Sequence, residues 1–268
     1  MKFENALTGN WKNAFNGLRN PMNSWDKSDS TFGICQIYGD EAIEVTDAWI
    51  TKLYPDLEKQ SDEWCDKINE IDDWLFKNGL IQYNDEDDVM EYAFIGPNDM
   101  DLAQRMIAAG SPNDKFLRQI FVSIDITAPL YWWKEMDTYK VGTTANSTST
   151  MHKLASTPIT MDCFEMDDFS EIGPANKKSW EMILRICEEL RILYNETKDI
   201  RYWKELIRIL PESWLQTRTF TCNYGVLRNI IKWRSDHRLR EWHKFVGFCK
   251  TLPYADELLF YKNNLIEN

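Results

Sequence analysis

The chain has 268 residues, of which 43% are hydrophobic and 13% aromatic, and its formal net charge is −12. This length supports one sizeable core or two modest ones, and the aromatic content argues against disorder, because disordered segments are poor in aromatic side chains. The acidic balance excludes a chain-wide basic surface for nucleic acid, so the sequence argues against a nucleic-acid partner.

No targeting or membrane-spanning segment stands out. The first ten residues lack the apolar stretch of a signal peptide, and no window approaches the run of about 18 apolar residues that a spanning helix needs. The six cysteines are irregularly spaced, without a C-x-x-C pair, which indicates reduced thiols. Three histidines cannot form a His-rich zinc site without carboxylate ligands, so no metal is expected. We therefore expect a cytoplasmic protein.

The first 95 residues carry weaker patterns and are expected to belong to the same globule as the rest. Residues 32–38 could form a short strand. Residues 49–80 have helical apolar spacing on an acidic background. The acidic run at 84–88 lacks the alternating oxygens and central glycine of a calcium loop, so we interpret it as a solvated turn.

From Gly96 the patterns sharpen. Asn98 or Asp99 is expected to cap a helix that ends at Gly110, and the alternation over residues 120–127 predicts a strand. Pro129 then opens a second helix, with Leu130, Trp133 and Met136 facing inward. Residues 142–150, rich in Thr and Ser, are expected to form a loop.

The second half is dominated by helices. An amphipathic helix is predicted over residues 177–195, with six inward positions (Trp180, Ile183, Leu184, Cys187, Leu190 and Leu193), and another over 202–210. Residues 217–222 predict a strand, Asn223 caps a long helix, and a further helix follows Asp236. This order indicates an α/β or α+β fold in which helices predominate.

Local chemistry leaves two features open. No nucleophile elbow, phosphate loop, dinucleotide fingerprint or H-E-x-x-H motif is present. The hydroxyl-rich segment 142–150 could bind an anion, or it could be an ordinary polar loop. Arg228 and Arg234 with Asn223 and Asn229 could bind a carboxylate or phosphate, or they could form a helix cap and a solvated helix face.

The stretch from residue 120 to 154 resembles the signature region of the flavin-dependent thymidylate synthase (ThyX) family. That family has a strand ending in Ala-Pro, a helix, and then Arg-His-Arg-x2-Ser-x-Asn-x2-Ser-x-Arg, and Ala128-Pro129 anchors the likeness here. Leu210-Pro211, Thr217, Asn223, Leu227, Asn229 and Arg234 fall at the spacing of a second family segment. The resemblance covers residues 96–257 and implies a ThyX-like core over 96–268, with a central mixed β-sheet and long packed helices.

Many polar positions of the family motif are replaced. Thr138, Tyr139 and Lys140 stand for Arg-His-Arg, and the following positions carry Thr143, Ala145, Thr148 and Thr150. Gly225 stands where the family has the arginine of Asn-Ala-Arg. Asn223, Asn229 and Arg234 are unchanged. Each lost arginine removes a charge-assisted contact of about 1.5–3 kcal/mol, unless Lys134, Lys140, Arg218 or Arg228 compensates. The loop would therefore suit a less charged ligand, or no ligand.

The resemblance implies a role for each remaining residue. Arg234 would act on the pyrimidine or its phosphate, as the catalytic residue. Asn223, Asn229, Lys140 and Tyr139 would bind the cofactor, FAD. The substrate pocket, for a nucleotide such as dUMP, would be lined by Thr143, Asn146, Thr148, Thr150 and Arg234. Folate and NADPH would be co-substrates, and the assembly would be a homo-oligomer, a tetramer in this family.

Three hypotheses remain open. The first is a divergent flavin-dependent transferase that moves one carbon to a pyrimidine nucleotide. The second is a non-catalytic binding protein on the same fold, whose acidic surface, at 85–88 and 165–171, engages a protein partner. The third is a coincidental likeness, which would require that the strands at 120–127 and 217–222 share no sheet.

Overall fold

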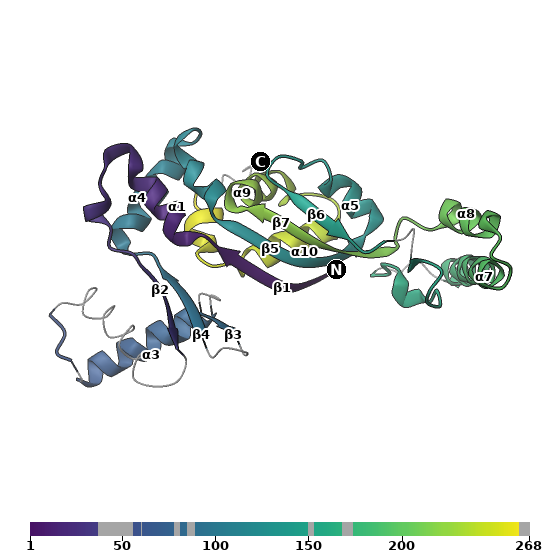
Figure 1. Cartoon of the computed structure of the whole chain (residues 1–268), viewed down its shortest axis with the longest axis horizontal. Helices are drawn as coiled ribbons and strands as arrows, with labels where there is room; N and C mark the ends of the chain where they lie inside the picture. Colours follow the sequence, from purple (N-terminus) through teal and green to yellow (C-terminus); the bar gives the residue numbers. More distant parts are fainter. Residues whose placement is uncertain are drawn as a thin grey trace. The chain divides into compact units, whose positions relative to one another are not determined.

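The computed structural model describes residues 1–36, 56–59, 61–77, 81–84, 89–149, 153–167 and 174–262. They form a mixed α/β structure, as the order of the predicted strands and helices indicated (Figure 1). The strand pairs β2–β4, β3–β4 and β6–β7 are antiparallel. The chain divides into two compact units. Unit 1 comprises Met1–Leu7 and Ser123–Cys222, and unit 2 comprises Thr8–Val122 and Asn223–Asn268. The expected division at residues 95 and 96 stays a prediction.

A four-stranded sheet contains both strands of the signature region, β5 and β6. Its order is β1 (Lys2–Gly9), β5 (Phe121–Pro129), β7 (Leu215–Asn223) and β6 (Thr144–Ser147). Along β5, Val122, Ile124 and Ile126 are buried, as their alternation predicted. Strands β5 and β7 are neighbours in one sheet. The hypothesis of a coincidental likeness required that these two strands share no sheet.

The helices that the structure describes in unit 1 include α5 (Leu130–Met136), α7 (Pro174–Thr197) and α8 (Ile200–Ile209), with a short 3-10 turn at Met161–Cys163. The last two helices pack around Cys187 and Leu206, which are fully buried. The prediction for Leu193 was wrong. It is 37% exposed because it lies about 240° around the helix from Cys187, away from the buried face.

Unit 2 contains a three-stranded antiparallel sheet of β2 (Thr31–Gln36), β4 (Val89–Phe94) and β3 (Ile81–Asn84), in that order. The strand predicted at 32–38 is β2, with its last two positions outside the described residues. Helix α3 spans Asp62–Lys77, and residues 56–59 just before it are not helical, so the predicted helix over 49–80 is not continuous. Residues 49–55 and the acidic run 85–88 also lie outside the described residues.

The remaining helices of unit 2 form its main core. They are α1 (Trp11–Arg19), α4 (Pro97–Ala109), α9 (Tyr224–Arg234) and α10 (Arg240–Cys249), with short turns at Asn20–Met22, Trp25–Lys27, Asn113–Gln119 and Ala255–Leu259. Tyr224 is buried and its hydroxyl donates to the Pro253 carbonyl at 2.6 Å. The ring of Trp11 meets it edge-on, with 5.3 Å between the centroids. No helix among the described residues is long and apolar enough to cross a bilayer.

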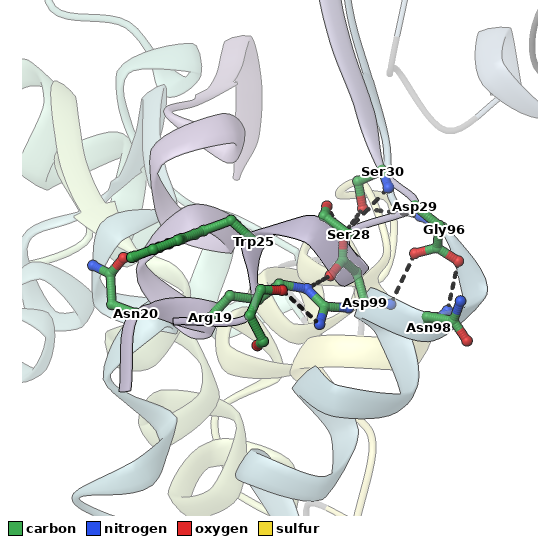
Figure 2. A network of polar contacts seen from close by, with 10 residues as sticks. Arg19, Asn20, Trp25, Ser28, Asp29, Ser30, Gly96, Asn98 and Asp99 are labelled. Atoms are coloured by element: carbon green, nitrogen blue, oxygen red, sulfur yellow. Dashed lines mark hydrogen bonds and ion pairs between the residues drawn. The ribbon is translucent and has the colours of Figure 1, made fainter. Parts of the chain in front are cut away.

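The start of α4 is organised differently from the prediction. Gly96 is the N-cap, and both Asn98 and Asp99 lie inside the helix. Their backbone N–H groups donate to the carboxylate of Asp29, at 2.8 and 3.0 Å (Figure 2). A side chain distant in sequence therefore takes the role of the cap, which frees Asp99 to face the interior.

Asp99 is the centre of a buried polar network. Its side chain is fully buried, and it accepts from the guanidinium of Arg19 and from the hydroxyls of Ser28 and Ser30 (Figure 2). Because both charges are removed from water and hydrogen-bonded, the pair fixes α1 and the 28–30 segment to α4.

Candidate functional site

The segment predicted as a polar loop is partly a strand. Residues Thr144–Ser147 form β6, an edge strand whose Thr144 and Asn146 lie opposite Thr221 and Thr219 of β7. All four residues of β6 are exposed. The correction has a simple cause, because Thr and Ser suit an edge strand as well as a loop once a neighbouring strand offers backbone partners.

The rest of this segment is held by one local hydrogen bond and by two hydrogen bonds to residues of β7. Thr143 donates its hydroxyl to the Tyr139 carbonyl, and the Thr148 N–H donates to Thr217 at 2.9 Å. The Thr148 carbonyl accepts from the amide of Gln216 at 2.8 Å. The hydroxyl of Thr143 is thus committed locally, whereas the side chains of Lys140 and Asn146 are exposed.

Trp133 and Arg218 make a stacked pair beneath this segment. The indole N–H of Trp133 donates to the Gln216 carbonyl at 2.9 Å, and the guanidinium carbon of Arg218 lies 4.3 Å from the ring centroid. Arg218 also donates to Asp137 and to the side chain of Gln216, at 2.8 and 2.9 Å. These contacts engage the guanidinium with groups of the protein itself.

Two other cations proposed to compensate for the lost arginines are likewise engaged. Lys134 pairs with Glu212 at 2.6 Å. Arg228 donates to the carbonyls of Leu258 and Leu259, at 3.1 and 2.9 Å, and burial lowers the pKa of its guanidinium. Of the four candidates, Lys140 is left as an exposed ammonium with no ion pair to a described residue.

The first turn of α9 offers backbone donors to an anion. The side chain of Asn223, which is buried, caps the helix by accepting from the Val226 N–H at 3.0 Å, as predicted. The Tyr224 N–H donates to the Ile120 carbonyl at 3.0 Å. Between them, the Gly225 N–H donates to none of the described residues. The positive end of the helix dipole adds to the potential at this amide.

Arg118 lies beside that amide. A Cβ atom placed on Gly225 would lie 3.0 Å from Cγ of Arg118 and 3.3 Å from Oδ1 of Asn223. The absence of a side chain at Gly225 therefore makes room for an arginine from another segment. Arg118 is exposed, and its Cγ is the atom that lies against the start of α9.

Sequence reasoning missed Arg118. The family position carries its arginine on the helix itself, and this chain has Gly225 there. Arg118 lies more than a hundred residues upstream of Gly225 and reaches it through packing of the 113–119 turn on α9. In the sequence, Arg118 is marked only by its position after the apolar pair Phe116-Leu117. That position does not distinguish Arg118 from other arginines of the chain.

The two other unchanged residues lie on different sides of α9. Asn229 is exposed. Arg234 is five positions later, about 140° around the axis, and its guanidinium carbon lies 4.7 Å from the ring centroid of the buried Trp242. Asn229 faces solvent one turn beyond Gly225, whereas Arg234 packs on α10, and the predicted role of each stays a prediction.

The predicted site residues fall into two groups. Unit 1 brings together Tyr139, Lys140, Thr143, Asn146 and Thr148, and unit 2 contains Asn223, Asn229 and Arg234. Thr150 lies outside the described residues. Burial strongly raises the pKa of the Cys222 thiol, so this cysteine beside Asn223 is no source of a thiolate nucleophile. Among the described residues no group of His, Cys, Asp and Glu could hold a metal ion.

Comparisons with known proteins give structural neighbours only. No protein-family model matches the chain, and no curated protein sequence matches it. Two solved structures of the flavin-dependent thymidylate synthase ThyX from Helicobacter pylori, each with FAD and dUMP, are similar to it. One has a TM-score of 0.47 and 18% identity over 62% of this chain and 83% of that chain. The other has a TM-score of 0.49 and 14% identity over 90% and 100%. Likeness at this level assigns neither ligand nor activity.

Proposed function

We propose that this chain binds a nucleotide cofactor through a phosphate at the start of α9, as a divergent ThyX-like protein. The observation that carries the proposal is that Arg118 packs against Gly225, whose backbone N–H donates to none of the described residues. An arginine and a helix-terminal amide can together bind a phosphate, because both groups donate hydrogen bonds to phosphate oxygens.

The residues of α9 fit a flavin nucleotide in part. Arg118 and Gly225 would hold one phosphate, and Asn229, about 6 Å further along the axis, presents an amide that can both donate to and accept from a ring edge. The bound flavin would supply the hydride.

The reaction implied by the resemblance is one-carbon transfer to a pyrimidine nucleotide such as dUMP, with folate and NADPH as co-substrates. Arg234 would orient the pyrimidine. No protein nucleophile is needed in this scheme, which agrees with the buried, protonated state of Cys222. A homo-oligomer is part of the same proposal.

Arg118→Ala is expected to weaken FAD binding by about ten- to a hundredfold, since a charge-assisted contact contributes about 1.5–3 kcal/mol. The measurement is a fluorescence titration of FAD with the purified protein. Arg105→Ala is the matched control, because Arg105 is an exposed arginine of the same unit, paired with Asp101 on α4. Equal affinity of wild type and Arg118→Ala, or no saturable binding by wild type, would contradict the proposal.

A second candidate function is protein interaction, and one observation favours it. Met182, Ile186 and Leu193 lie within about 40° of one another around α7, on the side opposite its packed face, and are 56%, 39% and 37% exposed. An apolar stripe on a solvent-facing helix is typical of a contact surface. Glu189 lies on the same side of α7, between Ile186 and Leu193 in sequence, and pairs with Arg185 at 3.8 Å.

Self-association through this stripe is expected to give a particle heavier than the 31.7 kDa chain in light scattering after gel filtration. Ile186→Glu should shift the mass toward the monomer, because it places a charge in the apolar contact. Glu181→Lys, on the same helix, is the control for a change of charge alone. A wild type that stays monomeric at about 50 μM would contradict self-association through this stripe.

A further inference from the structure

The other end of α9 carries an open pocket. Its volume is about 560 Å³, and it is lined by Lys232, Trp233, Asp236, His237 and Arg238. Small-ligand sites commonly have volumes of about 300–1,000 Å³, so a ligand of nucleotide size fits. All five residues come from one short stretch of unit 2, at the end of α9 and in the turn that follows it.

Trp233 gives this pocket a flat apolar surface. Its side chain is 58% exposed, although the ammonium of Lys232 lies 5.2 Å from the ring centroid. By contrast, Trp242 of the next helix is fully buried. An exposed indole beside a cation is suited to stack a nucleobase, because every base has a π-face that can pack on the ring.

The local charge favours an anionic group. The stretch from Lys232 to Lys244 has five Lys or Arg residues against two Asp or Glu, in a chain whose net charge is −12. Arg238 is exposed and makes no ion pair with any described residue. Arg238 and Lys232 therefore both bring a positive charge that can bind phosphate oxygens to the lining of this pocket.

Asp236 narrows the ligand class. An exposed carboxylate in the lining disfavours a bare polyphosphate, but it accepts hydrogen bonds from a base amino group or from ribose hydroxyls. A long polynucleotide is disfavoured as well, because its many phosphates would meet the strongly acidic remainder of the chain.

We propose that this pocket binds a nucleoside monophosphate. The base stacks on Trp233, the phosphate lies against Arg238 and Lys232, and the carboxylate of Asp236 accepts from the amino group or the ribose. The site is separate from the phosphate position at the start of α9, because Gly225 and Trp233 are eight residues apart, about 12 Å along the helix axis. It goes beyond the proposed function and does not depend on it.

The test is isothermal titration calorimetry of the purified chain with AMP, adenosine and inorganic phosphate, each in a separate titration. Wild type is expected to bind AMP with a Kd below about 1 mM, and adenosine and phosphate each at least about tenfold more weakly, since each makes only part of the contact. Trp233→Ala and Arg238→Ala should each weaken AMP binding about tenfold, through loss of stacking and of one charge-assisted contact respectively.

Two variants serve as matched controls. Trp25→Ala removes another exposed indole, 49% accessible, and Arg105→Ala another exposed guanidinium, and both should leave AMP affinity unchanged. Arg118→Ala should also leave it unchanged. Absence of AMP binding, equal loss in the controls, or equal loss in Arg118→Ala would overturn the proposal. If the chain binds AMP in this pattern but does not bind FAD, the AMP pocket is supported and the proposed function is contradicted.

Discussion

Asp99→Ala is expected to lower the free energy of unfolding by about 3–5 kcal/mol, because it leaves a buried arginine without its partner. Arg19 is 6% exposed and Asp99 is fully buried, and the carboxylate also accepts from Ser28 and Ser30. Removing it therefore leaves one charge and two hydroxyls without their acceptor, each at a cost in desolvation. Urea denaturation followed by circular dichroism measures the change.

The matched control for Asp99 lies two residues away. Asp101 pairs with Arg105 at 2.9 Å on the same helix, but the two side chains are 67% and 63% exposed. Asp101→Ala should cost less than about 1 kcal/mol, because solvent screens an exposed pair. Similar losses in the two variants would show that the Asp99 network does not hold unit 2 together.

Trp133→Ala is expected to have a comparable effect on unit 1, about 3–5 kcal/mol, through the cavity that it leaves. Trp133 is 1% exposed, its ring packs edge-on against Trp132 with 4.9 Å between centroids, and its indole N–H donates to β7. The change also removes the surface on which Arg218 stacks, so the support of the 137–149 segment should loosen.

Two measurements separate these effects of Trp133. Thermal denaturation gives the stability, and hydrogen exchange of residues 143–148 reports the loosening. Trp233→Ala, which removes an indole that is 58% exposed, should stay within about 0.5 kcal/mol of wild type. A Trp133→Ala protein with unchanged exchange in this segment would contradict the supporting role of the stacked pair.

Local patterns were sufficient to predict some elements. The strand β5 and the helices α9 and α10 were predicted because their apolar side chains repeat with periods of 2 and 3.6, and the cap at Asn223 acts within three residues. The strand β7 was predicted from residues 217–222 and extends slightly further at both ends. In each case the information lies within one short segment.

Other features depend on partners far away in the chain. The segment around β6 has the composition of a loop and becomes a strand because β7 lies beside it. The start of α4 depends on Asp29, about seventy residues upstream, and the cation at α9 comes from Arg118. Such tertiary contacts leave no periodic trace, so the candidate phosphate site could not be predicted from the sequence, although its helix and cap could.

The central claim is that a nucleotide phosphate binds at the start of α9, and a crystal structure of the protein with FAD tests it most directly. We expect a phosphate oxygen within about 3.2 Å of both the Gly225 nitrogen and the guanidinium of Arg118. Crystals in which FAD is bound with its phosphates away from both groups, or in which saturating FAD gives no bound flavin, would contradict the account.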